Sequence, residues 1–350
     1  MGSRIISFLI AFLIFSIVIL FHELGHFLLA KKNGIRVNEF CFGLGPTICG
    51  IQKGETKYSI KLFPFGGACV MEGEDEDSSD ERAFGKKSVW ARMSVVFAGP
   101  FFNFVLAFVF AFILMCCIGY DKPVLSDVSD GFPAQEAGLQ KGDEIVKMNG
   151  LSIHFAREIS AYSTFHSGET VEITYVRDGK KYQKTLEPKL DEESGRYLYG
   201  FVYSTQMRVK GNVLTNLRNS FYEVRYWIYT TIQSLRLLLT RQVSVTELSG
   251  PVGIVKNIGD TYQESVTTYG YFSAFLSMLN WAILLSANLG VMNLLPFPAL
   301  DGGRLVFLIA EAIRGKRIDP NKEGIVNLVG LGLLFALMFF VMFNDIRKLL

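Results

Sequence analysis

The sequence predicts a polytopic α-helical membrane protein with four transmembrane helices, a membrane-associated β-hairpin region and an inserted β-rich domain. Half of the 350 residues are hydrophobic and only 19% are charged, and the mean hydropathy is +0.29. Soluble domains carry about 25% charged residues, so the composition favours a membrane protein. The apolar residues also gather in four long uncharged stretches, which is the pattern of membrane-crossing helices.

The first uncharged stretch runs from Ile5 to Phe21, and apolar residues resume at Phe27. A helix over about residues 5–30 is long enough to cross a bilayer. The stretch is longer than the apolar part of a signal peptide and lacks an A-x-A-like cleavage site, so we expect a retained helix. Three further spans are predicted at residues 93–120, where Gly99-Pro100 interrupts the start, at 271–300 and at 325–343.

Lysine and arginine beside the spans predict the orientation, because short cytoplasmic connections are enriched in both. They lie between the first and second spans and between the third and fourth, at Lys31, Lys32, Arg36, Lys86, Lys87, Arg92, Arg314, Lys316, Arg317 and Lys322. We therefore expect a multi-pass protein of the cytoplasmic membrane, with the long segment between the second and third spans outside the cytoplasm. With this orientation, Arg347 and Lys348 after the fourth span lie outside the cytoplasm, where the rule disfavours lysine and arginine.

The chain is expected to have four parts. Residues 1–120 form an N-terminal membrane part, with a β-hairpin over 38–70 that turns near Lys53-Gly54. Residues 121–205 form the β-rich domain, with an alternating strand before Asp178-Gly179 and a returning strand after it. Residues 206–270 are amphipathic and expected at the membrane surface, and residues 271–350 form a C-terminal membrane part.

The sharpest motif is His22-Glu23-Leu24-Gly25-His26, at the cytoplasmic end of the first span. Residues four apart share one face of a helix, so both imidazoles can reach one zinc ion. Glu23 can accept a proton from the water that zinc acidifies and deliver it to a leaving amine. A chance match is the competing interpretation, but ionisable residues in a membrane span are costly and indicate function.

Two histidines leave a catalytic zinc site incomplete, because such sites usually have three protein ligands and an open position. His154 and His166 lie in the β-rich domain and are poor candidates. Asp301 follows the third span, after Pro296 and Pro298 and before Gly302-Gly303, and is the predicted third ligand. The alternative role for Asp301 is an N-cap of the helix that follows it.

Asparagines in apolar segments have two interpretations. Asn293 can bind the substrate backbone or the oxyanion, or it can satisfy backbone groups freed by Pro296. Asn103, Asn280 and Asn288 are expected to form hydrogen bonds between helices. The segment from Pro133 to Gly150 predicts a short helix, a Gly-Asp turn and a strand, in a fold that can accept an added peptide strand or act only as a spacer.

These motifs together resemble the site-2 protease family of intramembrane zinc metalloproteases, bacterial RseP/RasP type with a single PDZ domain. Four occur in the family's order: HELGH, Ala98-Gly99-Pro100-x-x-Asn103, the PDZ-like GLQKGDEIVKMNG, and the segment from Asn293 through Asp301-Gly302. The resemblance covers nearly the whole chain. It implies zinc bound by His22, His26 and Asp301, Glu23 as base and Asn293 near the substrate.

The resemblance also implies the activity and its partners. The family cuts single-pass membrane proteins within their transmembrane segments, typically anti-sigma factors and remnant signal peptides. One PDZ signature replaces the tandem pair of some relatives, so filtering of substrates by two PDZ domains is not expected. The hairpin at 38–70 is similar to a family loop that aligns an extended substrate.

Two other functions are compatible with parts of the sequence. A non-catalytic membrane scaffold would bind peptides through the PDZ domain and keep zinc structurally, but it would need four protein ligands and has no use for Glu23. A transporter would explain the broken helix near Pro296 but not the HExxH motif. The net charge of +2 and the lack of a basic patch with aromatics exclude a nucleic-acid partner, while the oligomeric state stays open.

Overall fold

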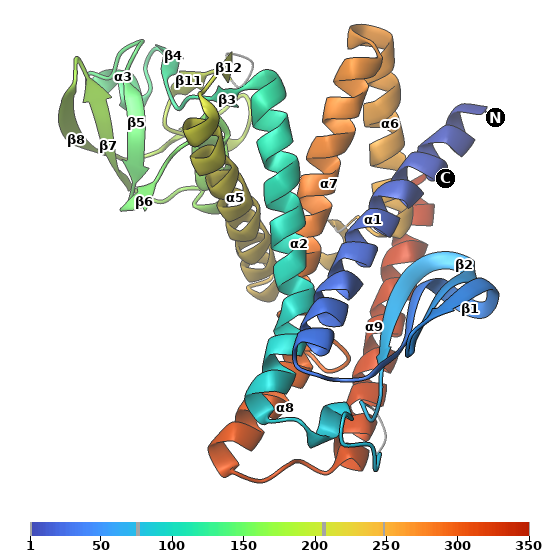
Figure 1. Ribbon diagram of the computed structural model, residues 1–350. Coiled ribbons are helices and arrows are strands. Elements are labelled where there is room, and N and C mark those ends of the chain that lie inside the picture. Colours follow the sequence, from blue (N-terminus) through green and yellow to red (C-terminus); the bar gives the residue numbers. More distant parts are fainter. Residues whose placement is uncertain (1, 75–77, 205–207, 248, 350) are drawn as a thin grey trace. The chain divides into compact units, whose positions relative to one another are not determined.

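The computed structural model describes residues 2–74, 78–204, 208–247 and 249–349 (Figure 1). The chain forms two compact units. The first comprises Met1–Phe110 and Val243–Leu350, and the second comprises Ala111–Gln242. Each unit has hydrophobic core residues of its own.

Four helices are long and apolar enough to cross a membrane, as the sequence predicts. They are α1 (Gly2–Lys32), α2 (Val89–Ile118), α7 (Tyr271–Asn293) and α9 (Pro320–Leu349). Two predicted boundaries were wrong. The third span ends at Asn293 rather than at residue 300, because proline lacks a backbone N–H and Pro296 and Pro298 prevent the helix from continuing. The second helix begins at Val89 and continues through Pro100.

Two clusters of buried apolar residues hold the first unit together. In one, Ala11, Ile14 and Val18 of α1 pack with residues of α2, α7 and α6 (Pro251–Tyr269). Figure 1 shows α6 and α7 side by side, and Gly270 joins them with a φ of 83°. The other cluster joins the end of α1 to the β-hairpin, the start of α2 and Leu308 of α8 (Asp301–Arg314). The hairpin and α8 are thereby held against the same end of α1.

The predicted hairpin consists of β1 (Val37–Lys53) and β2 (Thr56–Met71), which are joined by a turn at residues 54–55. The strands are long and fold back on themselves, since Phe42 pairs with both Gly67 and Ile60. The segment around Phe42 therefore lies between two parts of β2. Within the described chain, residues 67–71 of β2 pair on one side only, with β1, and form an edge.

The second unit contains the β-rich domain. Its main sheet is antiparallel with the order β6-β5-β7-β8, and the predicted turn between β7 and β8 has Asp178 and Gly179 at positive φ. The strands of this sheet are β5 (Glu144–Met148), β6 (Leu151–Ser152), β7 (Val171–Arg177) and β8 (Lys180–Leu186). Ile145, Met148 and Ile173 lie in a core with Ile159 of helix α4 (Ala156–Phe165).

Smaller elements complete the second unit. They are β3 (Tyr120–Asp121), β4 (Leu125–Val128), α3 (Pro133–Glu136), β9 (Lys189–Asp191), β10 (Arg196–Leu198), β11 (Phe201–Tyr203), β12 (Arg208–Val209) and α5 (Val213–Leu239). The amphipathic segment at 206–270 is divided between the units, with α5 in the second and α6 in the first. Short 3-10 turns occur at Phe84–Lys86 and Val245–Glu247.

A buried ion pair attaches α8 to the start of α2. Arg92 Nη1 donates to Glu311 Oε2 at 3.0 Å, and Nη2 donates to the other oxygen of the same carboxylate. The side chains are only 7% and 14% exposed. Two parallel hydrogen bonds fix the orientation of both groups as well as their distance.

We expect Arg92→Ala to destabilise the protein by about 3–5 kcal/mol, because it leaves the Glu311 carboxylate buried without its partner. Thermal unfolding of the detergent-solubilised protein, followed by tryptophan fluorescence, measures the effect. Arg36→Ala is the control, since Arg36 is 46% exposed in its pair with Asp80 and should change Tm little. Equal Tm values for the two variants would contradict the assignment of Arg92 as an anchor.

Candidate active site

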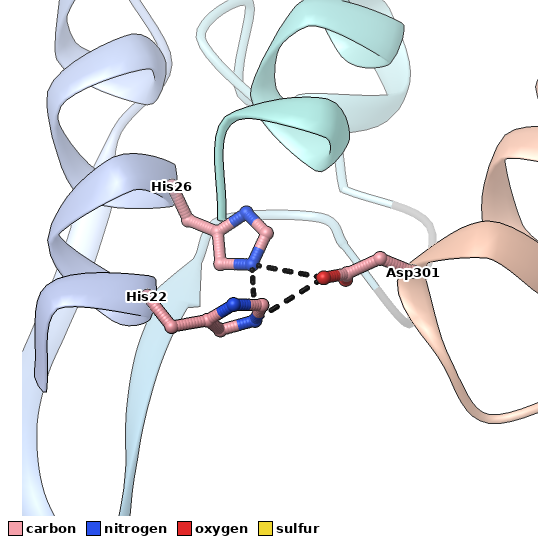
Figure 2. A group of neighbouring side chains, drawn as sticks. All are labelled: His22, His26 and Asp301. Atoms are coloured by element: carbon pink, nitrogen blue, oxygen red, sulfur yellow. Dashed lines mark hydrogen bonds and ion pairs between the residues drawn. The ribbon is translucent and has the colours of Figure 1, made fainter. Parts of the chain in front are cut away.

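Helix α1 presents both histidines of the HExxH motif on one face, as the spacing predicts (Figure 2). The Nε2 atoms of His22 and His26 are 3.2 Å apart. Both side chains are about nine-tenths buried. In an apolar helix bundle, two imidazoles so close together require a shared partner, because burial of an unpaired polar group is costly.

Asp301, the first residue of α8, supplies that partner. Its Oδ2 lies 3.1 Å from His22 Nε2 and 3.5 Å from His26 Nε2. The N-cap of α8 is Leu300, which makes no side-chain cap bond. Asp301 is thus not the N-cap, and its carboxylate faces the imidazoles (Figure 2). Burial favours a higher pKa for Asp301, but the neighbouring imidazoles of His22 and His26 hold the pKa below its ordinary value.

The donor set fits a metal ion. One nitrogen of each histidine and one oxygen of Asp301 lie within 4.8 Å of one another, and among the described residues no other such cluster of His, Cys, Asp or Glu occurs. Asp301 Oδ2 is buried without a hydrogen bond in the described structure. Two imidazole nitrogens and one carboxylate oxygen are a ligand set that catalytic zinc uses.

The outer nitrogen of His26 is fixed by the backbone of α2, since Nδ1 donates to Val95 O at 2.9 Å. This bond leaves the lone pair of Nε2 facing Asp301 and His22. A hydrogen bond from the second ring nitrogen selects the tautomer that binds a metal and increases its basicity. The position of His26 is thereby set by two helices rather than by α1 alone.

The outer nitrogen of His22 lies beside two amides, Asn103 Nδ2 at 3.3 Å and Asn293 Nδ2 at 3.5 Å. The fully buried Asn103 has no partner for Oδ1 among the described residues. A half-turn of the Asn103 amide exchanges its oxygen and nitrogen, so Oδ1 then accepts a hydrogen bond from His22 Nδ1. That orientation gives Oδ1 a partner, puts Nδ2 in the position that Oδ1 has here, and leaves His22 Nε2 free for a metal.

Glycines allow α1 and α2 to approach closely at the histidines. A Cβ atom on Gly99 would lie 2.3 Å from His26 Nε2 and 2.8 Å from His22 Cε1. A Cβ on Gly25 would lie 2.4 Å from the carbonyl oxygen of Ala98. Both distances are far below van der Waals contact, so any larger residue would force the helices or the imidazoles apart.

The loop between α7 and α8 is packed just as tightly, against Gly302 and Gly303. A Cβ on Gly302 would lie 2.1 Å from Leu295 O, and one on Gly303 would lie 2.3 Å from Phe297 O. Ala299 has a φ of 72°, an unusual conformation for a residue with a side chain. The loop therefore determines where the Asp301 carboxylate lies.

A cavity of about 310 Å³ opens onto the cluster. It is lined by His22, Glu23, His26, Gly67, Ala68, Cys69, Val70, Met71, Glu74, Val96, Asp301 and Arg304. Glu23 Cγ lies close to Gly67, where an added Cβ would be 3.2 Å away. Glu23, the three clustered groups and the edge segment of β2 thus face one space.

Other polar residues singled out in the sequence have different surroundings. Asn293 lies at the end of α7 beside the His22 ring and is not among the residues that line this cavity. His154 packs on the Tyr222 ring and His166 contacts Glu169, both in the second unit. Asn103 of α2 contacts His22 of α1, which confirms its expected role as a hydrogen-bonding group between helices, although the pattern did not predict which residue is its partner.

Comparison with known proteins identifies the chain. The model of peptidase family M50 matches residues 10–337. A protein of Clostridium acetobutylicum named as a zinc metalloprotease is 38% identical and covers 97% of both chains. The regulator of sigma-W protease RasP of Bacillus subtilis is 30% identical over 99% of both. A solved PDZ domain from Listeria monocytogenes is 27% identical, with a TM-score of 0.21, and covers 24% of this chain and 88% of its own.

Four membrane-type helices and the full-length similarity to named zinc metalloproteases define a multi-pass membrane metalloendopeptidase with zinc as its cofactor. The chain belongs to peptidase family M50, the site-2 protease family, over most of its length. The resemblance inferred from the ordered motifs is therefore confirmed.

We expect Gly99→Ala to lower the zinc content of the purified protein, because the new methyl group would displace His26 Nε2 from its position. Metal analysis by mass spectrometry measures the zinc-to-protein ratio. Gly332→Ala in α9 is the matched control, since its Cβ would meet nothing within 4 Å. Full zinc occupancy in Gly99→Ala would contradict the tight contact between Gly99 and the histidines.

Asn103 provides a second test of the surroundings of His22. Asn103→Leu removes the acceptor for Nδ1–H and should weaken zinc binding by about 10–100-fold, the usual effect of losing such a contact. Asn103→Asp retains an acceptor and should keep zinc affinity near that of the parent. Zinc affinity is measured by competition with a fluorescent chelator. Equal weakening in both variants would show that packing, rather than the hydrogen bond, is what matters.

Proposed function

We propose that this chain is a zinc-dependent intramembrane endopeptidase that hydrolyses peptide bonds within transmembrane segments of single-pass membrane proteins. His22, His26 and Asp301 bind the zinc ion and Glu23 is the general base. The observation that carries the proposal is the convergence of three ligand atoms within 4.8 Å, in a cavity that Glu23 also lines. The transmembrane character of α1, which bears three of the four residues, supports catalysis within the membrane.

Each residue of the site has a chemical role. A bound zinc ion supplies a Lewis acid that acidifies water and polarises the scissile carbonyl. Glu23 accepts a proton from the attacking water and delivers it to the nitrogen of the departing amine. Asn103 and Val95 O orient His22 and His26 through their outer ring nitrogens. Asn293 lies beside the His22 ring, and its proposed role is to donate a hydrogen bond from its amide to a substrate carbonyl.

The edge of β2 is the proposed binding surface for the substrate backbone. Peptide bonds in a transmembrane helix are already hydrogen-bonded within the helix, so attack requires local unwinding. An unwound segment can add as a strand to residues 67–71, which pair with β1 on one side only in the described chain. The edge also lines the cavity with Glu23, so an added strand runs past the reactive groups.

We further propose that the β-rich domain is a PDZ domain outside the cytoplasm that controls access of the substrate. The Lys and Arg residues that flank the spans support this orientation. A cavity of about 440 Å³ lies in this domain. Most of its lining residues come from α4 and from the segment 196–203, among them Ser160, Thr164, Arg196 and Phe201. Such a groove suits an extended peptide.

Anti-sigma factors and remnant signal peptides are the proposed substrates. Both are short single-pass proteins after an earlier cut has removed their outer part. The similarity to a relative named as a regulator of a sigma factor supports the first class. The coarser assignment, a metalloendopeptidase, does not depend on which class is cleaved.

The test is cleavage of a single-pass membrane substrate by parent and Glu23→Gln protein reconstituted in liposomes. We expect the variant to bind zinc as the parent does but to cleave at least about 100-fold more slowly, the usual contribution of a general base. A chelator should abolish cleavage by the parent, and added zinc should restore it. A Glu23→Gln protein as active as the parent would sink the proposal, and binding without cleavage in both proteins would indicate a scaffold.

A further inference from the structure

A second cavity adjoins the candidate active site. Its volume is about 510 Å³, and it is lined by residues of the loop before α8, of α8 itself and of α9, with Glu74 and Arg317. Three of its lining residues, Glu74, Asp301 and Arg304, also line the cavity of the metal cluster. The two cavities therefore meet at these side chains.

Glu74 and Arg304 form an ion pair at this boundary. Arg304 lies one helical turn after Asp301 on α8, and its Nη1 donates to Glu74 Oε1. The other oxygen of Glu74 accepts from the backbone N–H of Met71 at 3.4 Å. The pair thereby connects the helix that bears Asp301 to the end of the β2 edge.

Arg304 also contacts a second carboxylate, that of Glu323. Its Nε lies 3.6 Å from Glu323 Oε1 of α9, and Glu323 lines only the second cavity. The Phe84 ring lies 5.7 Å from the guanidinium and is itself buried. Arg304 is 21% exposed, and ion pairs with partial access to water exchange partners at little net cost.

We propose that the Glu74–Arg304 pair is a gate between the two cavities, and that Arg304 opens it by exchanging Glu74 for Glu323. With Arg304 on Glu74, Asp301 is the one group of the metal cluster that borders the α9 cavity, and the pair separates His22, Glu23 and His26 from it. With Arg304 on Glu323, the two cavities join, and water and hydrophilic solutes reach the cluster. The gate rests on the proposed function, because hydrolysis needs water at the groups that bind zinc.

Two isosteric substitutions give opposite expectations. Glu74→Gln weakens the closed arrangement, whereas Glu323→Gln removes the charge that holds the open one. The measurement is the rate at which EDTA withdraws zinc from the detergent-solubilised, zinc-loaded protein in the absence of substrate. We expect Glu74→Gln to raise this rate by about tenfold, as loss of one charge-assisted hydrogen bond allows, and Glu323→Gln to lower it.

Further variants separate a gate from general loosening. Arg304→Gln should release zinc as fast as Glu74→Gln. The variant that combines Arg304→Gln with Glu74→Gln should release zinc no faster than either single variant. Asp80→Asn, which neutralises a carboxylate that pairs with Arg36, should release zinc at the rate of the parent. Loosening would raise the rate in both Glu74→Gln and Glu323→Gln.

The proposal requires that Glu74→Gln releases zinc faster than the parent and that Glu323→Gln releases it more slowly. Any other pattern of release rates overturns it. Should Glu74→Gln fail to fold, Arg304→Gln takes its place in the comparison. Zinc release is measured without substrate, so it is independent of proteolysis. A parent protein that binds zinc but cleaves no membrane substrate would refute the proposed function and leave the gate result interpretable.

Discussion

The site depends on the close approach of helices α1 and α2, whose backbones are separated by no side chain at Gly25 and Gly99. Two imidazoles in an apolar bundle need partners for all their nitrogens, because unpaired polar groups are costly away from water. Gly25 and Gly99 remove the side chains that would otherwise separate the helices. As a result, His26 reaches Val95 O and His22 reaches Asn103, while both inner nitrogens face the same point.

Helix α2 also positions Asp301, the third group of the cluster. Ser286 of α7 donates to the backbone oxygen of Asn103 at 2.7 Å, so α7 is attached next to the residue that contacts His22. The tight loop after α7 then carries the chain to Asp301 within a few residues, because Gly302 and Gly303 let α8 start against the loop backbone. The carboxylate position is therefore a consequence of where α7 docks on α2, and the Arg92–Glu311 pair fixes the far end of α8 to the same helix.

Much of the site could be predicted from the sequence because its signals are local or rare. His22 and His26 are one helical turn apart, and Asp301 is an acidic residue next to a broken apolar span. Contacts between distant segments carry no such signal. The sequence does not state that Gly99 faces both histidines or that Asn103 is the residue beside His22. It also predicts two strands at 38–70 but not that Phe42 pairs with two parts of the second strand. The alternation of apolar and polar residues predicts which face of a strand is buried, but it does not identify the residues with which the strand pairs.

Hydrolysis in a membrane requires two things that lipid excludes, an extended peptide backbone and water. Unwinding a substrate helix exposes N–H and C=O groups that the hydrocarbon region cannot satisfy. Among the described residues, 67–71 pair on one side only, so this edge beside Glu23 is the proposed partner for those groups. The polar residues Glu74, Arg304 and Asp301 border the same space from the α9 side. Peptide and water are thus expected to enter from different walls of one cavity, so that the strand need not displace the water it reacts with.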